Sequence, residues 1–392
     1  MKQYVNLFLI SLLACYGING AEAEELTLLF AGDAMQHQSQ IDNAFRNDRY
    51  DYSSYFQHIT YEITHADIAV VNLETTLGGK PYKGYPLFSA PDEYACALKD
   101  AGFDVFLTAN NHILDRFSKG LHRTLDVLDS LSIKHTGVFR NAAERKEIYP
   151  LIIEKKNIRI AFLNYTYATN GINPTFPDYV NYIDVIQIQK DIQRAKELKA
   201  DFIIANMHWG EEYKLSQNTM QEKMAELLIN KGVNIVTGSH PHVVQPSLAI
   251  TDSAGVISNL IIYSLGNFVS AMTAPNTDGG QMIKIVLDKE DDVPIISSCG
   301  YMLIYTEKKK SGNKIDFSVV PVLWAESSGK IPLFHTPFVR LDSINYLKMR
   351  KFADNARTVF NTGNKGIAEF RLIAPKRRED FLTKKLPVKF VE

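Results

Sequence analysis

The sequence predicts an α/β fold built on a largely parallel sheet, and three observations support this. Short apolar, β-rich runs alternate with amphipathic helical patterns from residue 26 onward, which is typical of parallel sheets. The apolar runs are continuous, as expected when both faces of a sheet are covered. The chain has 392 residues, 45% of them hydrophobic and 22% charged, which indicates one large or two ordinary globular domains.

The expected elements follow in order along the chain. The predicted strands are 26–33, 67–74, 104–112, 158–167, 201–208, 234–240 and 260–267. The helical patterns between them are YSSYFQHITYEITHA, PDEYACALKDAG, LHRTLDVLDSLSI, VIQIQKDIQRAKELKA and QNTMQEKMAELLINKG. After residue 278, QMIKIVLD, GYMLIYTEKK and KIDFSVVPVLW predict consecutive strands, hence an antiparallel addition, either a second sheet or a small cap. SINYLKMRKFADNARTVFN then predicts one helix followed by a basic tail.

The first 23 residues predict a secretory signal peptide. A lysine precedes a short apolar run, and Ala21 and Ala23 form an A-x-A site, so we expect cleavage after Ala23 and export to the periplasm or cell envelope. The run is shorter than the roughly 20 residues of a membrane span. Cys15 also permits lipoprotein anchoring, which ranks second because a bulky leucine precedes Ala14.

Charge and cysteine content exclude some classes of function. The net charge of −1 gives no basic excess for nucleic acid, and no polybasic run suits anionic lipid. After the expected cleavage only Cys96 and Cys299 remain. They could pair in an oxidising compartment, although Cys96 sits in a helical pattern, where a small core residue is the commoner interpretation.

Polar side chains collect where the apolar runs end. The residues at or just after these ends are Asp33, Asn72, Glu74, Asn110, Asn111, His112, His208, His240 and His242. In an open α/β sheet, ligands bind outside the carboxyl ends of the strands. Nitrogen and oxygen donors from separate strands are what a divalent-metal site needs. We therefore predict a metal site at this edge.

The stretch NIVTGSHPHVVQP, residues 234–246, places two histidines around Pro241 at a strand end. The strand end fixes the approach of His240, and the proline limits the backbone so that His242 can return towards the same centre. An isolated H-P-H would be better interpreted as a pair of hydrogen-bonded loop histidines. Donors at the other strand ends favour metal. A TIM-barrel hydrolase is disfavoured, because its H-x-H is expected at the first strand rather than the fifth or sixth.

At this point a resemblance to a known family emerges. GDAMQHQ, NLETTL, ANNHILD, NYTYATNG, HWGEEY, GSHPHVVQP and YSLGNFV occur in this order, and together they resemble the bacterial capsule-synthesis CapA family, named for poly-γ-glutamate capsules. The resemblance runs from about residue 26 to 290. That family is similar in fold to calcineurin-like metallophosphoesterases, which implies a four-layer α/β/β/α sandwich with mixed sheets. The implied domain spans 24–330, with late strands 281–324 completing the second sheet and a helical extension at 331–392.

The resemblance also implies a site with two divalent ions, with Mn, Fe or Zn as the expected metals. Asp33 and His242 would bind the first metal, and Glu74 would stand where the superfamily usually has a bridging aspartate. The implied ligands of the second metal are Asn111, His208 and His240. His112 would face the leaving group as acid or charge stabiliser, and Asp115 would either hydrogen-bond His112 or cap the next helix.

Two departures from the superfamily pattern concern the first metal more than the second. The usual first motif is Asp-x-His, but Asp33 is followed by Ala34 and Met35, and His37 lies further on. Glutamate at position 74 lengthens the bridge by one methylene relative to aspartate.

Other side chains are candidates for supporting roles. Glu211 and Glu212 could hold an imidazole tautomer or lie in a solvated turn. Lys83, like Lys80, could meet an anionic substrate or simply be solvated. Asn267 ends another strand and could reach the rim of the site, and Asn72 and His37 are further candidates for contact with a ligand residue or with substrate.

The leading functional hypothesis is an exported protein of capsule or exopolymer synthesis that carries out metal-assisted hydrolysis or transfer. The expected partners are an anionic polymer or phosphoester substrate and an envelope capsule-synthesis machinery, without nucleic acid; the oligomeric state stays open. The alternative is a non-catalytic polymer-binding or assembly component. The missing Asp-x-His favours it, and the Asn111-His112 pair argues against it. A general secreted metallophosphoesterase is the third hypothesis.

Overall fold

The computed structural model describes residues 25–290, 293–312, 314–327, 339 and 341–370, so the predicted signal peptide and Cys15 lie outside the described residues. The strands are β1 (Leu26–Ala34), β2 (Phe45–Arg46), β3 (Arg49–Tyr50), β4 (Ile68–Leu73), β5 (Val105–Leu107), β6 (Lys134–Thr136), β7 (Val138–Phe139), β8 (Leu151–Lys155), β9 (Ile158–Thr166), β10 (Tyr179–Val180), β11 (Phe202–His208), β12 (Ile235–Ser239), β13 (Ser247–Thr251), β14 (Ile257–Ile262), β15 (Asn267–Val269), β16 (Gly279–Glu290), β17 (Val293–Ser311), β18 (Lys314–Pro321) and β19 (Ala368–Glu369). The helices are α1 (Gln38–Ala44), α2 (Thr60–Thr64), α3 (Asp92–Asp100), α4 (Phe117–Ser130), α5 (Ala142–Ile148), α6 (Val185–Glu197), α7 (Thr219–Lys231), α8 (Val322–Ser327) and α9 (Ser343–Gly363).

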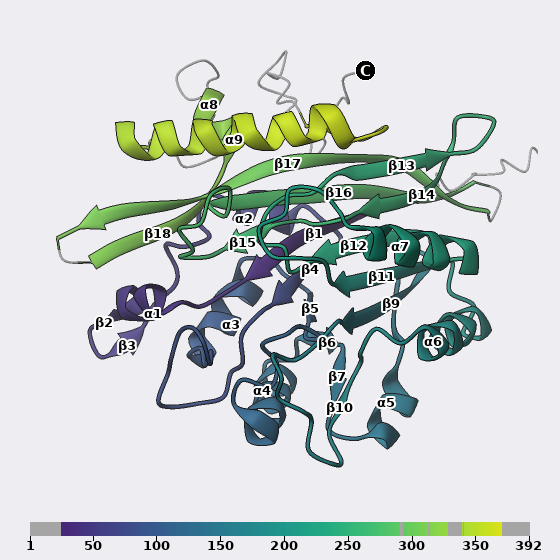
Figure 1. Ribbon diagram of the computed structural model, residues 1–392, viewed down its shortest axis with the longest axis horizontal. Coiled ribbons are helices and arrows are strands. Elements are labelled where there is room, and N and C mark those ends of the chain that lie inside the picture. Colours follow the sequence, from purple (N-terminus) through teal and green to yellow (C-terminus); the bar gives the residue numbers. More distant parts are fainter. Residues whose placement is uncertain (1–24, 291–292, 313, 328–338, 340, 371–392) are drawn as a thin grey trace, which may run out of the picture.

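The sheet is mixed, as predicted. Its main path runs β6-β5-β4-β1-β16-β17-β14-β12-β11-β9-β8. The strands β6, β5, β4 and β1 are parallel to one another, and so are β14, β12, β11 and β9. The long antiparallel strands β16 and β17 join the two parallel halves, and β18 pairs with β17 (Figure 1).

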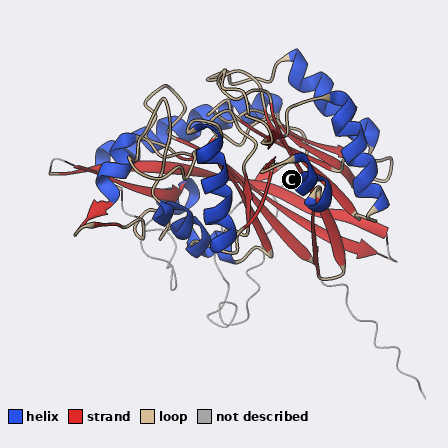
Figure 2. Cartoon of the chain, turned by 90° about the horizontal axis from the view of Figure 1, so that it is seen from below, coloured by secondary structure: helices blue, strands red, loops and turns tan. Residues whose placement is uncertain are grey.

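Three apolar clusters define the layers. In β1, Leu28 and Phe30 face the central cluster between the two halves of the sheet, whereas Leu29 and Ala31 face a second cluster with α3. This alternation follows from the two-residue period of a strand. The third cluster lies between α6, α7 and the outer faces of β9 and β11. The predicted four-layer α/β/β/α sandwich is therefore confirmed, with its two sheets continuous through β16 and β17. Figure 2 shows the strands with helices on both sides of them.

Strand register brings the carboxyl ends to one edge. Asp33 in β1 pairs with Asn72 in β4 on one side and with Asn267 in β15 on the other. In the other half of the sheet, His208 in β11 pairs with Ser239 in β12. Since all these pairings are parallel, the loops that follow the strands emerge together.

Several predicted strands are shorter in the structure. The run 104–112 forms a strand only as β5, because residues 108–116 turn back to present their polar side chains. The run 260–267 is divided between β14 and β15. A continuous apolar pattern does not show where pairing stops, because pairing depends on the neighbouring strand.

The C-terminal helix α9 lies along β17 (Figure 1). Asp342 caps its first turn by accepting a hydrogen bond from the Asn345 N–H, and Met349, Phe352 and Phe360 are buried in the central cluster. No helix in the part of the chain that the structure describes has the length and hydropathy needed to cross a membrane.

The disulfide that the sequence left open is not formed. Cys96 on α3 and Cys299 on β17 are both free thiols.

Candidate metal centre

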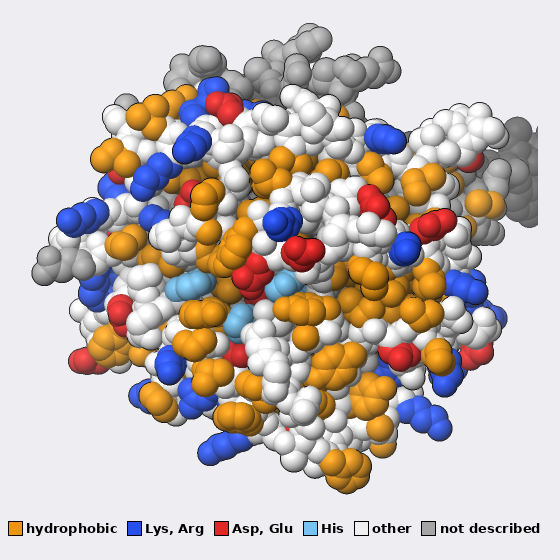
Figure 3. Space-filling model, viewed as in Figure 1, with side chains coloured by type: hydrophobic (Ala, Val, Ile, Leu, Met, Phe, Trp, Pro, Cys, Tyr) orange, Lys and Arg blue, Asp and Glu red, His pale blue; other side chains and the backbone are white. Residues whose placement is uncertain are grey.

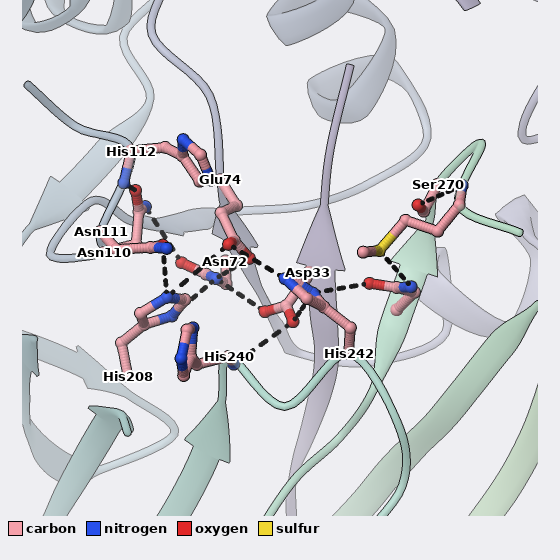
Figure 4. A network of polar contacts seen from close by, with 12 residues as sticks. Asp33, Asn72, Glu74, Asn110, Asn111, His112, His208, His240, His242 and Ser270 are labelled. Carbon is pink, nitrogen blue, oxygen red and sulfur yellow. Dashed lines mark hydrogen bonds and ion pairs between the residues drawn. The ribbon is translucent and has the colours of Figure 1, made fainter. Parts of the chain in front are cut away.

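The residues predicted as metal ligands lie together at the strand ends (Figure 4). They are Asp33, Glu74, Asn111, His208, His240 and His242, none more than 4% exposed. Asp33 lies in β1, His208 ends β11, and the others lie in the loops after β4, β5 and β12. Residues far apart in sequence thus form one buried cluster of oxygen and nitrogen donors.

Glu74 lies at the centre of this cluster. Its Oε1 atom is 3.7 Å from the Nε2 atoms of both His208 and His242. Two groups of side chains have ligand atoms within 4.8 Å of one another: Glu74 with His240 and His242, and Glu74 with Asp33 and His208. Glu74 belongs to both groups, so its carboxylate has the position that a bridging ligand requires.

The two groups divide the ligands differently from the division that the family resemblance implies. Here Asp33 is grouped with His208, and His240 is grouped with His242. Asn111 contacts the cluster through its Oδ1 atom, which lies 2.9 Å from Nε2 of His208.

The H-P-H turn is held in an uncommon backbone conformation. His240 has a φ of +99° and His242 has a φ of +58°. Both values lie in the left-handed region, which residues other than glycine rarely adopt. The His240 N–H donates to Oδ2 of Asp33 at 3.3 Å. This contact ties the turn to β1 and directs both imidazoles into the cluster.

Hydrogen bonds define the protonation of His242. Its Nδ1 atom lies 3.0 Å from Oδ2 of Asp33 and 3.1 Å from Oδ1 of Asn267, and both of these oxygens accept. Nδ1 therefore carries the proton, and Nε2, which faces Glu74, keeps the lone pair that binds a metal. Asn267, expected at the rim, is instead fully buried and orients this imidazole.

Asn72 links the two carboxylates. Its Nδ2 atom donates to Oδ1 of Asp33 at 2.8 Å and lies 3.4 Å from Oε2 of Glu74. Asn110 donates in turn to Oδ1 of Asn72 at 3.3 Å and to the Leu73 carbonyl at 2.8 Å. These amides hold the two carboxylates in fixed positions beside each other.

Burial and mutual repulsion perturb the pKa values of the cluster. Burial, followed by the repulsion of nearby Asp33, raises the pKa of Glu74 well above its usual value. Burial would also raise the pKa of Asp33, but hydrogen bonds and attraction from His242, together with His208 and Asn72, hold it below its usual range. The centre therefore contains one strongly acidic carboxyl group and one that resists ionisation while no cation is near.

The same burial lowers the pKa values of two imidazoles in the cluster. Burial, then repulsion from His242, lowers the pKa of His240 to about 3. Burial, then repulsion from His240, lowers the pKa of His208 well below its usual value. Both rings are neutral at neutral pH, and this is the form in which imidazole binds a metal ion.

Two buried atoms in the cluster have no hydrogen-bond partner among the residues that the structure describes. They are Oε1 of Glu74 and Nδ1 of His240, which belong to the same ligand group. A buried polar atom without a partner costs free energy, and a divalent cation between these residues would satisfy both atoms. The donor set therefore fits a metal ion.

A second pair of residues lies beside the cluster. Nδ1 of His112 is 2.7 Å from Oδ2 of Asp115, which also accepts the Phe88 N–H at 2.7 Å. Burial raises the pKa of Asp115. Asp115 does not cap α4, whose N-cap is Arg116. The ring of Phe88 packs edge-on against His112, with centroids 4.6 Å apart.

His37 lies outside both ligand groups. It is the N-cap of α1, and its Nδ1 atom is 3.3 Å from Oε1 of Gln40 and 3.4 Å from the Ala271 nitrogen. Burial lowers the pKa of His37 to about 4. Its ring is 5.3 Å from that of Phe88, so it lies at the margin of the site.

The charged candidates are exposed. Lys83 lies on the loop that leads to Phe88, and Glu211 and Glu212 follow β11. Glu211 contacts Asn218, and neither glutamate forms a hydrogen bond with an imidazole in the described part of the chain.

The loop after β9 supplies residues that sequence reasoning missed. The side chain of Asn170 lies 3.3 Å from both Asn111 and His112. The N–H of Tyr167 donates to the His208 carbonyl at 3.0 Å, and its ring is 4.5 Å from the His240 ring. This loop also follows a parallel strand, so the rule applied to the other strand ends would have indicated the loop, but not which of its residues contact the cluster.

The fold and the cluster define an α/β sandwich protein with a candidate divalent-metal centre at its strand ends. Residues 27–272 match the sequence model of the family described as "Bacterial capsule synthesis protein PGA_cap". The match covers more than half of the chain, which belongs to this family.

Two relatives illustrate the similarity. The chain is 30% identical over 262 residues to "Capsule biosynthesis protein CapA" of Bacillus anthracis, covering 63% of this chain and 60% of that protein. It is 29% identical over 204 residues to "PGA biosynthesis protein CapA" of Bacillus subtilis (strain 168), covering 49% of each chain. The matched part thus spans 49% to 60% of the length of these relatives.

Among solved structures, the calcineurin-like phosphoesterase YfkN from Bacillus subtilis has a TM-score of 0.44 and 14% identity, with coverage of 86% of this chain and 98% of that chain. The NAD nucleotidase NadN of Haemophilus influenzae has a TM-score of 0.47 and 14% identity, with coverage of 92% and 66%. Neither similarity bears on the activity of this chain.

Proposed function

We propose that this protein is a metal-dependent hydrolase or transferase that acts in the synthesis of a capsule or exopolymer of the poly-γ-glutamate type. The observation that carries the proposal is Glu74: its carboxylate belongs to both ligand groups, and its Oε1 atom is buried with no hydrogen-bond partner in the described part of the chain. Membership of the capsule-synthesis family supports the biological role.

Two divalent ions held by the six ligand residues would polarise a phosphoryl or acyl oxygen and activate water near neutral pH. Asp33 and Asn267 keep Nδ1 of His242 protonated, so that its Nε2 stays available as a ligand. Asn72 bridges the carboxylates of Asp33 and Glu74. These contacts preorganise the ligands on rigid strand ends.

His112 would serve as the general acid. The Asp115 carboxylate accepts Nδ1–H and stabilises the charged imidazolium, while Nε2 donates its proton to the departing oxygen. Phe88 packs on this ring and shields the pair from water. The proposed substrate is a phosphoester or acyl linkage, with an anionic polymer and an envelope capsule-synthesis machinery as partners.

One observation favours a second candidate, a non-catalytic polymer-binding or assembly component. His37, the histidine nearest in sequence to a superfamily ligand that this chain lacks, is engaged with Gln40 and Ala271 rather than with the cluster. A chain that retains one structural ion but turns over no substrate would fit this arrangement.

The test compares the parent, Glu74→Gln and a surface control, Asp354→Asn on α9. Each protein is stripped of metal, reloaded with Mn, Zn or Fe, and analysed for bound metal and for turnover of phosphodiesters and γ-glutamyl oligomers. We expect about two ions and turnover in the parent and control, with both reduced in Glu74→Gln. One ion without turnover in the parent would favour the assembly role, and turnover of phosphoesters alone would favour a general metallophosphoesterase.

We also propose export, with cleavage after Ala23. The support is the signal-peptide pattern of residues 1–23. Mass spectrometry of the mature N-terminus tests it: a chain that still begins at Met1 would contradict export, and a lipidated Cys15 would indicate a lipoprotein.

A further inference from the structure

Three tyrosines with exposed rings stand around the candidate metal centre. Tyr85 is 72% exposed, Tyr167 is 45% exposed and Tyr213 is 44% exposed. They come from three separate loops, after β4, β9 and β11. In Figure 3, histidine and acidic side chains reach the surface near the middle of the face, with hydrophobic side chains on either side of them. We call these three residues the tyrosine rim.

Tyr167 is fixed over the imidazoles. Its N–H donates to the carbonyl of His208 at 3.0 Å, so its backbone is bonded directly to a ligand residue. Its ring centroid lies 4.5 Å from that of His240 and 6.4 Å from that of His208. Nearly half of the side chain nevertheless remains open to solvent.

Tyr213 is tied to the same centre through the H-P-H turn. Its N–H donates to the Pro241 carbonyl at 2.8 Å, and its ring lies 6.4 Å from that of His242. Its φ of +67° is uncommon for a bulky residue. A strained backbone that places an exposed aromatic ring beside a ligand is typical of a functional position.

Tyr85 extends the rim on the side of the proposed general acid. Its ring is 6.2 Å from that of Phe88, which is 4.6 Å from that of His112. Tyr85 also lies close enough to Tyr213 to contribute to the raised pKa of that phenol. The rim therefore continues from the metal ligands to the residue expected to face the leaving group.

The charge beside the rim is negative. Burial, then repulsion from Glu212, raises the pKa of Tyr213 to about 12, and the same two causes raise the pKa of Tyr167. The faces of aromatic rings are themselves electron-rich. A negative group that touched these rings beside Glu212 would be repelled, so the carboxylates of an anionic polymer would lie away from the rim, whereas a flat uncharged group would stack on it.

We propose that the tyrosine rim is a substrate subsite that stacks against a planar, uncharged group beside the scissile bond, either an aryl ring or the plane of an amide. This inference rests on the proposed function, because it names the flank of the substrate whose reacting oxygen the metal centre would bind. In this proposal the tyrosine rim selects the substrate and takes no part in bond cleavage.

The test measures binding by calorimetry of phenylphosphonate, cyclohexylphosphonate and 4-carboxyphenylphosphonate to metal-loaded protein. The first two match in size and charge but differ in planarity, and the third adds a negative group. We expect phenylphosphonate to bind about three- to tenfold tighter than either analogue, as an aromatic contact of this type provides. Tyr167→Ala and Tyr85→Ala should remove the preference, while Tyr167→Phe and the distant control Tyr346→Ala should keep it.

Metal content is measured on every variant, so that a loss of preference is attributed to the rim only where the ions are retained. Equal affinities for the phenyl and cyclohexyl compounds, or a preference that survives in Tyr167→Ala and Tyr85→Ala, would overturn the subsite and leave the proposed function standing. Failure of the metal-loaded parent to bind any phosphonate would overturn both.

Discussion

The Nδ1 atom of His112 lies 2.7 Å from the Oδ2 atom of Asp115, and both side chains are buried. A carboxylate can only accept, so this contact keeps the proton on Nδ1 and orients the ring. The same oxygen accepts the Phe88 N–H, so the dyad is attached to the loop that also carries part of the tyrosine rim.

The dyad predicts a leaving-group effect. If His112 protonates the departing oxygen, His112→Ala should lower kcat by about 10²- to 10⁴-fold for an alkyl phosphodiester. The loss should be much smaller for a nitrophenyl ester, whose leaving group needs no proton. Asp115→Asn should give an intermediate loss, because the amide still accepts Nδ1–H but stabilises the imidazolium less. Equal losses for both esters, with metal content unchanged, would contradict the acid role.

The ligand cluster predicts unequal effects of two histidine substitutions. His240→Ala removes a donor held by the strand end and the strained turn, so metal affinity should fall by at least about 10- to 100-fold. His37→Ala removes a side chain that contacts Gln40 at the margin of the site, and metal affinity should stay near that of the parent. Affinities come from competition with a chelating dye. Loss of an ion in His37→Ala would instead show that this histidine replaces the missing Asp-x-His ligand.

The depressed pKa of His240 predicts acid sensitivity of the metal-free protein. Its pKa is about 3 in the folded chain and about 6.5 when exposed. Between these values the unfolded chain binds a proton that the folded chain does not, so stability is full above about pH 6.5 and falls as the pH is lowered towards 3. The slope is at most roughly 1.4 kcal/mol per pH unit for one such group.

Urea unfolding in chelator at pH 7, 6, 5 and 4 measures this slope. His240→Ala should show a shallower decline than the parent, even though it starts from a different stability. Glu74, whose pKa is raised, acts in the opposite direction in both proteins and therefore cancels in the comparison. If stability declined with pH equally steeply in the parent and in His240→Ala, His240 would be ruled out as the source of the acid sensitivity.

Close packing of β1 against the segment before β15 predicts a large effect of one methyl group. A Cβ atom at Gly32 would lie 1.9 Å from the Gly266 carbonyl oxygen, which accepts the Asp33 N–H at 3.0 Å. Gly32→Ala should destabilise the fold by about 1–3 kcal/mol or more and weaken metal binding by shifting Asp33. The matched control is Gly171→Ala, whose Cβ atom would meet nothing within 4 Å. It should destabilise the fold by only about 1 kcal/mol, because the one cost is an alanine at a φ of +75°. Similar losses in chemical denaturation would contradict this account.

Sequence reasoning predicted the candidate ligands by applying one physical rule. Continuous apolar runs predicted parallel strands, and polar residues at their ends had to meet at one edge. Asp33, His208 and His240 were found in this way, before any packing was known. The four layers followed from the family resemblance.

The tertiary structure decided what periodicity does not encode. Where β5 stops, and how the run 260–267 divides into two strands, depend on the neighbouring strand rather than on the local pattern. The grouping of Asp33 with His208 and the protonation of Nδ1 in His242 depend on distances of a few ångströms between side chains from different loops.

The positions of Asn170 and Tyr167 were also decided by the fold. Their sequence context shows only that they follow a strand, and a polar or aromatic residue in a loop is most often solvated. Packing of the loop after β9 against β11 brings Tyr167 onto His240 and Asn170 beside His112. The sequence by itself determined which strand ends carry donors, because the end of an apolar run and the polar residues that follow it can be read from the local sequence. The structure alone decided which candidate donors lie close enough to share an ion, because that depends on side-chain geometry across loops.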